Sequence, residues 1–266
     1  MYVVERWLAR LSRSPYADDF VLKGGMLLAA FGSRRPTADA DALARNMAAD
    51  EQTVAQRVVE IAAIPDPDDG VEYLTSTVKT STIRDDALYS GVRVTVDARL
   101  GTARLRLKLD INFGDPVTPR PRLVELLSLL PGAEPVRVLG YPVETVLAEK
   151  LTTAINLGPA STRVRDWADV YTLVRTQDLD ATAVRTALEA TARFRGIDLR
   201  PLSEAIGDLA ALRAATYTTY RRHLGPDGEH LPPDFADLVD AVVAFADPLL
   251  DGGSPRHWDA ATRWDH

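Results

Sequence analysis

Two glycines and two aspartates near the N-terminus are the residues of this chain best suited to chemistry. Gly24 and Gly25 precede a hydrophobic segment, and Asp39 and Asp41 follow after thirteen intervening residues. Because glycine has no Cβ, the backbone here can approach a phosphate, and the N–H groups at the start of a following helix point at such an anion. Aspartates one residue apart on an extended segment project to the same side, where both can bind one Mg²⁺ that also contacts substrate phosphates. The pattern predicts a site for nucleotide transfer.

A third aspartate, Asp110, lies on the polar face of the strand predicted over residues 105–113. An ordinary surface aspartate paired with Lys108 would have the same pattern. If this strand lies beside the one that carries Asp39 and Asp41, the three carboxylates converge. Three acids can hold two Mg²⁺ ions, which stabilise the entering and leaving oxygens of an in-line displacement. We therefore predict Asp39, Asp41 and Asp110 as metal ligands, with Asp110 assisting the metals or activating the acceptor hydroxyl.

A basic and acidic cluster occurs in the C-terminal half. Lys150 falls within a helix predicted over residues 142–157, and a second helix is predicted over residues 163–175. Asp166 and Asp169 are three residues apart, so they share a face of the second helix. Lys150 can bind a phosphate as a point charge, although a lysine in an ordinary helix salt bridge has the same pattern. The cluster consists of Lys150, Arg163, Arg165, Asp166 and Asp169.

Hydrophobic periodicity predicts the elements that position these residues. Strict alternation over residues 92–100 and 105–113 predicts an antiparallel hairpin. Apolar residues at helical spacing predict helices over residues 3–12 and 50–64, and almost only helices after Pro142, including helices near 181–194, 201–214 and 233–246. The expected fold class is α+β, a small mixed β-sheet core with flanking helices followed by a helical C-terminal module. The expected domains are 1–140, 141–250, which completes the active site, and a tail over 251–266 that Trp258 and Trp264 anchor.

Composition excludes several classes of protein. The chain has 266 residues, 46% hydrophobic and 26% charged, which is ordinary for a globular protein. It has no cysteine, so disulfides, thiolate catalysis and cysteine zinc sites are excluded. A net charge of −7 argues against a surface coated in positive potential, and no apolar stretch is long enough to span a bilayer. We expect a cytoplasmic protein without membrane contact, monomeric when free.

The diglycine, the Asp-x-Asp pair and the later strand aspartate together resemble the DNA polymerase β-like nucleotidyltransferase superfamily. Five segments in order and spacing are similar to the AbiEii/AbiGii nucleotidyltransferase toxins, which include the MenT-like toxins: FVLKGGMLLAAF, RPTADAD, LKLDINFGDPV, YPVETVLAEKL and RVRDWADVYTL. The resemblance implies that Asp39 and Asp41 bind metal and that Lys150 contacts nucleotide phosphates. It implies that Asp166, or else Asp169, completes the active site. Thr37 matches a hydroxyl position that is phosphorylated in some members.

The resemblance implies the toxin of a bacterial toxin–antitoxin pair. Such a protein transfers a nucleoside monophosphate from an NTP to RNA, expected to be the tRNA 3′ acceptor end, with Mg²⁺ as cofactor and a cognate antitoxin as partner. Gly24, Gly25 and Lys150 would hold the triphosphate, while Arg163 and Arg165 are candidates for phosphate or RNA contact. Two alternatives stay open: modification of a small molecule such as an antibiotic, and a degenerate module that binds nucleotide or antitoxin without turnover. Substitution of Lys150 by alanine is expected to abolish transfer and to leave the fold intact.

Overall fold

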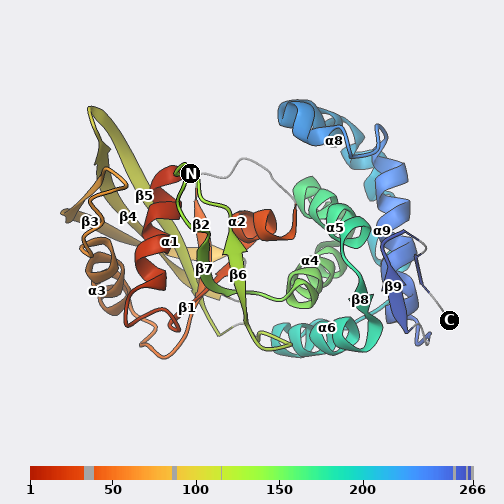
Figure 1. The fold of residues 1–266 in the computed structure, drawn as a ribbon. Coiled ribbons are helices and arrows are strands. Elements are labelled where there is room, and N and C mark those ends of the chain that lie inside the picture. Colours follow the sequence, from red (N-terminus) through yellow and green to blue (C-terminus); the bar gives the residue numbers. More distant parts are fainter. Residues whose placement is uncertain (33–38, 86–88, 115, 254–255, 262, 265–266) are drawn as a thin grey trace. The chain divides into compact units, whose positions relative to one another are not determined.

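The structure is a computed structural model, and it describes residues 1–32, 39–85, 89–114, 116–253, 256–261 and 263–264. The chain divides into two compact units. The first takes Met1–Ala30, Pro36–Asp115 and Pro121–Tyr141, and the second takes Phe31–Arg35, Pro116–Arg120 and Pro142–His266. A mixed sheet with helices forms the first unit, and helices dominate the second (Figure 1), which confirms the predicted α+β class.

A seven-stranded sheet forms the centre of the first unit. Its strands are β1 (Phe20–Lys23), β2 (Ala40–Ala44), β3 (Val71–Asp85), β4 (Tyr89–Leu100), β5 (Ala103–Phe113), β6 (Arg122–Leu126) and β7 (Val136–Gly140). They are ordered β3-β4-β5-β2-β1-β7-β6. The pairs β2–β5 and β1–β7 are parallel, and the other neighbours are antiparallel. The helices of this unit are α1 (Tyr2–Ser12), α2 (Gly24–Leu28) and α3 (Glu51–Ala62), and the 3-10 turn η1 (Ala29–Phe31) follows α2.

The hairpin of β4 and β5 is the antiparallel pair that hydrophobic alternation predicts. Leu100 pairs with Ala103 across a two-residue turn, and the register continues from there along both strands. Strands β3, β6 and β7 were not predicted. In β3, Val71 and Tyr73 are buried, but polar residues fill most other described positions, so a hydrophobic alternation is hard to detect. Strands β6 and β7 have five residues each, which is too short for a clear period.

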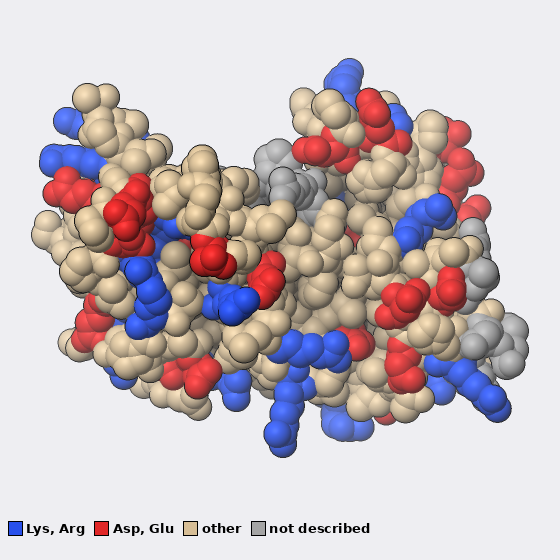
Figure 2. Space-filling model, viewed as in Figure 1, with Lys and Arg blue, Asp and Glu red and all other residues tan. Residues whose placement is uncertain are grey.

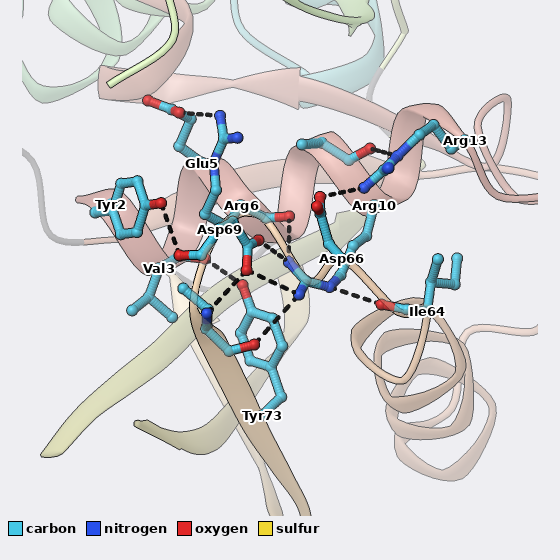
Figure 3. Close-up of polar contacts among 12 residues, drawn as sticks. Tyr2, Val3, Glu5, Arg6, Arg10, Arg13, Ile64, Asp66, Asp69 and Tyr73 are labelled. Carbon is cyan, nitrogen blue, oxygen red and sulfur yellow. Dashed lines mark hydrogen bonds and ion pairs between the residues drawn. The ribbon is translucent and has the colours of Figure 1, made fainter. Parts of the chain in front are cut away.

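A buried polar cluster attaches α1 to the segment before β3 (Figure 3). Arg10 donates to both carboxylate oxygens of Asp69, at 2.5 and 3.3 Å, and to the carbonyl oxygens of Ile64 and Val71. The two side chains are 3% and 0% exposed. Burial raises the pKa of Tyr73 against the opposing charge of Arg10, and the Tyr73 hydroxyl donates to the Val3 carbonyl. The cluster therefore holds the N-terminal helix in place through charge as well as apolar packing.

We expect Arg10→Ala to lower the free energy of unfolding by about 3–5 kcal/mol, because it leaves the Asp69 carboxylate buried without its cation. Urea unfolding followed by circular dichroism measures this. Arg13→Ala is the matched control, since Arg13 lies on the same helix and pairs with Asp66 at the surface. That variant should change the unfolding free energy by less than about 1 kcal/mol. Equal effects of the two substitutions would contradict the assignment.

The second unit contains mainly helices. They are α4 (Val143–Leu157), α5 (Val164–Thr176), α6 (Ala181–Arg195), α7 (Leu202–Ile206), α8 (Leu209–Leu224) and α9 (Phe235–Leu250), with 3-10 turns η3 (Gly158–Ala160) and η4 (Gly225–Gly228). The helix predicted over residues 201–214 is in fact two helices, because Gly207 adopts a φ of +51° between α7 and α8. None of the described helices is both long and apolar enough to cross a membrane.

The C-terminal segment, expected as a tail, contributes two strands to a small sheet. Strands β8 (Leu179–Asp180), β9 (His257–Asp259) and β10 (Arg263–Trp264) pair antiparallel in the order β10-β9-β8. The Trp258 indole donates to the Val174 carbonyl at 2.5 Å, and the Trp264 indole donates to the Phe245 carbonyl at 2.9 Å. Both tryptophans therefore attach the segment to the helices of its own unit.

The surface of the described residues carries charges of both signs. Figure 2 shows acidic and basic side chains mixed over the viewed face. This agrees with the net charge of −7 and the argument against a general basic coat.

Candidate active site

The parallel pairing of β2 with β5 places the first group of predicted residues on neighbouring strands. Asp41 is the register partner of Asp110. Asp39 directly precedes β2, and its contact with Lys108, which lies two residues before Asp110 on β5, places its side chain on the same side of the sheet. The intervening Ala40 and the following Ala42 are buried on the other side. The strands that carry Asp41 and Asp110 therefore lie side by side, which the sequence alone could not show.

The diglycine lies directly against this group. Gly24 has a φ of +66°, and a Cβ built on it would lie 2.0 Å from Oδ2 of Asp41. Only glycine fits here, since any side chain would both strain the backbone and collide with the carboxylate. Helix α2 has only five residues, so its dipole adds little to anion binding. The backbone of Gly24 and Gly25 remains the feature suited to a close phosphate contact.

Cations pair with the carboxylates on this face. Lys108 Nζ lies 2.5 Å from Asp39, and the Arg93 guanidinium binds both oxygens of Asp110, each at 2.7 Å. The hydrogen bonds to Asp110, with the charges of Asp110, Asp39 and Asp41, raise the pKa of Arg93. Lys108 therefore pairs with Asp39 and not, as the ordinary surface pattern would have it, with Asp110.

Lys23 completes the row of charges. It is the register partner of Asp41 on β1, it is 9% exposed, and its Nζ lies 5.1 Å from the centre of the Tyr141 ring. Sequence reasoning missed both Lys23 and Arg93. Arg93 could have been found from the hairpin, because a two-residue turn after Leu100 dictates that Arg93 faces Asp110. Lys23 had no such local signal, since the pairing of β1 with β2 spans a long connection.

The carboxylates of this group are the kind of ligand that a hard divalent cation prefers, and they project to the same side of the sheet. Mg²⁺ is a cation of this kind, and Asp39 and Asp41 supply two of these carboxylates. The position that a Cβ at residue 24 would fill adjoins the Asp41 carboxylate. Among the described residues, however, no three acidic or histidine side chains are grouped closely enough to hold a metal. The assignment of Asp39, Asp41 and Asp110 as metal ligands stays a prediction.

The second predicted cluster lies within the helical unit, where α4 carries Lys150 and α5 carries two aspartates. Lys150 Nζ donates to Asp166 Oδ1 and to Asp169 Oδ2, each at 2.7 Å. Arg163 donates to the other oxygen of Asp166 at 2.6 Å. The Lys150 side chain is 14% exposed and that of Asp169 only 2%. The three-residue spacing of the aspartates does place both on the face that meets α4.

Electrostatics keep this cluster charged. Burial disfavours the ammonium of Lys150, but the charges of Asp169 and Asp166 outweigh it and raise the Lys150 pKa above its usual 10.5. Burial also acts against the Asp166 carboxylate, but Lys150 and Arg163 prevail and lower its pKa from 3.8 to about 2. A lysine held so firmly in its charged form is suited to binding an anion and not to accepting a proton.

The lowered pKa of Asp166 predicts that the free energy of unfolding falls at acidic pH. The Asp166 pKa is lower in the folded than in the unfolded protein, so its contribution is present above pH 4 and disappears as the pH falls towards 2. We expect a loss of about 2 kcal/mol over this range from Asp166 alone. Urea unfolding from pH 5 to pH 2 measures it, and Asp166→Asn should lose less stability over this range. If wild type and Asp166→Asn lost the same stability between pH 5 and pH 2, the lowered pKa of Asp166 would be contradicted.

The remaining predicted residues have simple placements. Arg165 is exposed on α5, and Arg163 is exposed where it precedes that helix. Thr37 lies outside the described residues.

The chain is similar to known proteins in its sequence family and in its fold. The family model described as nucleotidyl transferase AbiEii toxin, type IV TA system, matches residues 6–241. No curated protein matches the chain. Among solved structures, a candidate nucleotidyltransferase from H. pylori has 16% identity and a TM-score of 0.51, covering 94% of this chain and 93% of its own. JHP933 from Helicobacter pylori has 14% identity and a TM-score of 0.47, with coverage of 94% and 90%.

The first of these structures supports the nucleotidyltransferase-like fold, and the family match spans most of the chain. This chain therefore belongs to the AbiEii family of type IV toxin–antitoxin systems, and it is a nucleotidyltransferase.

Proposed function

We propose that the protein is the toxin of its pair and that it transfers a nucleoside monophosphate from an NTP to an RNA hydroxyl. The acceptor is the 3′ end of tRNA, and the effect is to block translation. The acceptor oxygen forms a bond to the α-phosphorus, the bond from that phosphorus to the β-phosphate oxygen breaks, and pyrophosphate leaves. A tRNA whose acceptor end is blocked cannot be aminoacylated, which explains toxicity. The protein acts in the cytoplasm as a monomer and is countered by a cognate antitoxin.

The observation that carries this proposal is the contact of the Asp41 carboxylate with the diglycine, beside Asp110 on the adjacent strand. A phosphate-accepting backbone next to paired carboxylates suits a metal-bound triphosphate. We assign metal binding to Asp39 and Asp41, with Asp110 supplementing them or taking the proton of the acceptor hydroxyl. Mg²⁺ would supply charge neutralisation at the triphosphate and polarise the reacting oxygens.

We assign the other predicted residues to substrate binding. Gly24 and Gly25 contact the triphosphate through their N–H groups, and Lys150 contacts it as a fixed positive charge. Asp166 and Asp169 orient Lys150 through the ion pairs described above. The exposed Arg163 and Arg165 contact nucleotide or RNA phosphates. Thr37 is a candidate regulatory site, because a phosphate near Asp39 and Asp41 would repel both metal and triphosphate.

The test is nucleotidyl transfer by purified protein. The protein is incubated with Mg²⁺, total tRNA and each of the four labelled NTPs in turn, with Asp39→Ala as the negative control. Labelled tRNA that is absent with the variant supports the proposal. Failure to label any RNA with all four NTPs would contradict it, and binding of NTP without transfer would favour the degenerate module. Growth arrest on expression, as opposed to resistance to an antibiotic, separates the toxin from an enzyme that modifies small molecules.

A further inference from the structure

Among the described residues, each carboxylate proposed to bind metal has a cation next to it on the sheet. In one row across the sheet, Lys23 on β1, Asp41 on β2, Asp110 on β5 and Arg93 on β4 are successive register partners. In the next row, Asp39 pairs with Lys108 of β5. Register partners on neighbouring strands project to the same face, so three acids and three bases lie together there.

The oxygens that these cations contact are the ones that a divalent ion needs. Arg93 binds Asp110 with the two-pronged geometry in which both carboxylate oxygens accept a hydrogen bond, and this is the strongest form of such a pair. Lys108 contacts Oδ2 of Asp39 at 2.5 Å. A divalent ion at these oxygens would have to displace both side chains and would be repelled by their charges while they stay near.

We propose that Arg93 and Lys108 are substrate-binding cations that occupy the metal-binding oxygens of Asp110 and Asp39 until a nucleotide arrives. The triphosphate offers both cations new anionic partners, so the carboxylates can take a divalent ion only together with the nucleotide. This inference rests on the proposed function and adds two residues and an order of binding to it. In the protein without nucleotide, the affinity for a divalent ion is low.

The position of these pairs distinguishes them from an ordinary cross-strand salt bridge, and their exposure leaves them able to move. Asp110 is the register partner of Asp41, and Asp39 comes two residues before Asp41, so each of the two cations lies beside more than one of the proposed metal ligands. The Arg93 and Lys108 side chains are 38% and 29% exposed, so both can turn towards a ligand without leaving a core.

The same hairpin offers a matched control. Arg106 of β5 pairs with Asp97 of β4 at 2.8 Å. Asp97 is the register partner of Arg106, as Arg93 is of Asp110, and the positions differ by an even number along each strand, so both pairs lie on the same face. Arg106 therefore reproduces the type of ion pair at a distance from Asp39 and Asp41.

The experiment measures Mn²⁺ binding by electron paramagnetic resonance in wild type, Arg93→Ala, Lys108→Met and Arg106→Ala, with and without a non-hydrolysable NTP analogue. Without the analogue, we expect Arg93→Ala and Lys108→Met each to bind Mn²⁺ about tenfold more tightly than wild type, since a positive charge close to the ion is removed. Arg106→Ala should bind Mn²⁺ as wild type does. With the analogue, wild type should bind Mn²⁺ tightly, and both site variants should bind the analogue more weakly.

Equal Mn²⁺ affinity of wild type, Arg93→Ala and Lys108→Met in the absence of nucleotide would overturn the inference, while RNA labelling by wild type would leave the proposed function standing. Absence of Mn²⁺ binding by every variant, with nucleotide as well as without, would overturn both. Circular dichroism checks that each variant is folded. If Arg93→Ala does not fold, Lys108→Met decides the question, because it acts on a different carboxylate by the same mechanism.

Discussion

Lys150→Ala should lose nucleotidyl transfer by at least about a hundredfold, because a fixed charge aimed at a reacting phosphate typically contributes that much. The structure adds an effect that the sequence did not suggest. Lys150 neutralises Asp166 and Asp169, the second of which is almost fully buried. Removing the ammonium leaves these carboxylates without their main partner, so we expect the unfolding free energy to fall by about 3 kcal/mol. The expectation that this variant leaves the fold intact is therefore revised.

Two variants separate the effect on transfer from the effect on folding. Arg195→Ala removes the ion pair with Glu149, which is the residue before Lys150 on α4 and is similarly buried. It should lose stability but retain transfer within about threefold of wild type, since neither Arg195 nor Glu149 is assigned to substrate binding. In the double variant Lys150→Ala, Asp169→Asn, the buried carboxylate that lost its partner is also removed. This variant should be more stable than Lys150→Ala alone but should not regain transfer. Full labelling by a folded Lys150→Ala protein would rule out a phosphate contact of Lys150.

Gly24→Ala should also abolish most transfer, through the position of Asp41. The new Cβ would lie 2.0 Å from the Asp41 carboxylate oxygen, so the carboxylate or the turn must move. A displacement of about 1 Å in a catalytic group can lower the rate about a hundredfold. The substitution also places a side chain at a φ of +66°, which costs about 1–2 kcal/mol of stability. Steady-state transfer assays and urea unfolding measure the two effects.

Gly101→Ala is the control for this variant. Gly101 has a φ of +58° in the turn between β4 and β5, and a Cβ there would meet no atom within 4 Å. It should therefore lose a similar amount of stability and keep its transfer activity. If both variants lose activity equally, backbone strain and not the contact with Asp41 is responsible.

Much of the fold could be predicted where the signal is local. The hairpin of β4 and β5 was predicted because a short turn joins two strands of clear alternation. Helices α1, α3, α4, α5 and α6 were predicted to within a few residues from their apolar periodicity. Strands β6 and β7 were missed, since five-residue segments have no reliable period and obtain their pairing from the sheet. The break between α7 and α8 was missed because a single glycine decides it.

The sequence by itself determined the residue types and spacings that make a nucleotidyltransferase recognisable: the diglycine, the Asp-x-Asp pair, and a lysine followed by two aspartates three residues apart. These depend on neighbours along the chain. The tertiary structure alone decided that Lys108 pairs with Asp39, that Lys23 lies opposite Asp41, and that Asp41 packs against Gly24. Each of these contacts joins strands or turns that are separate in the sequence. Sheet order and register decide them, and both are set by the burial of whole strand faces, not by any local pattern.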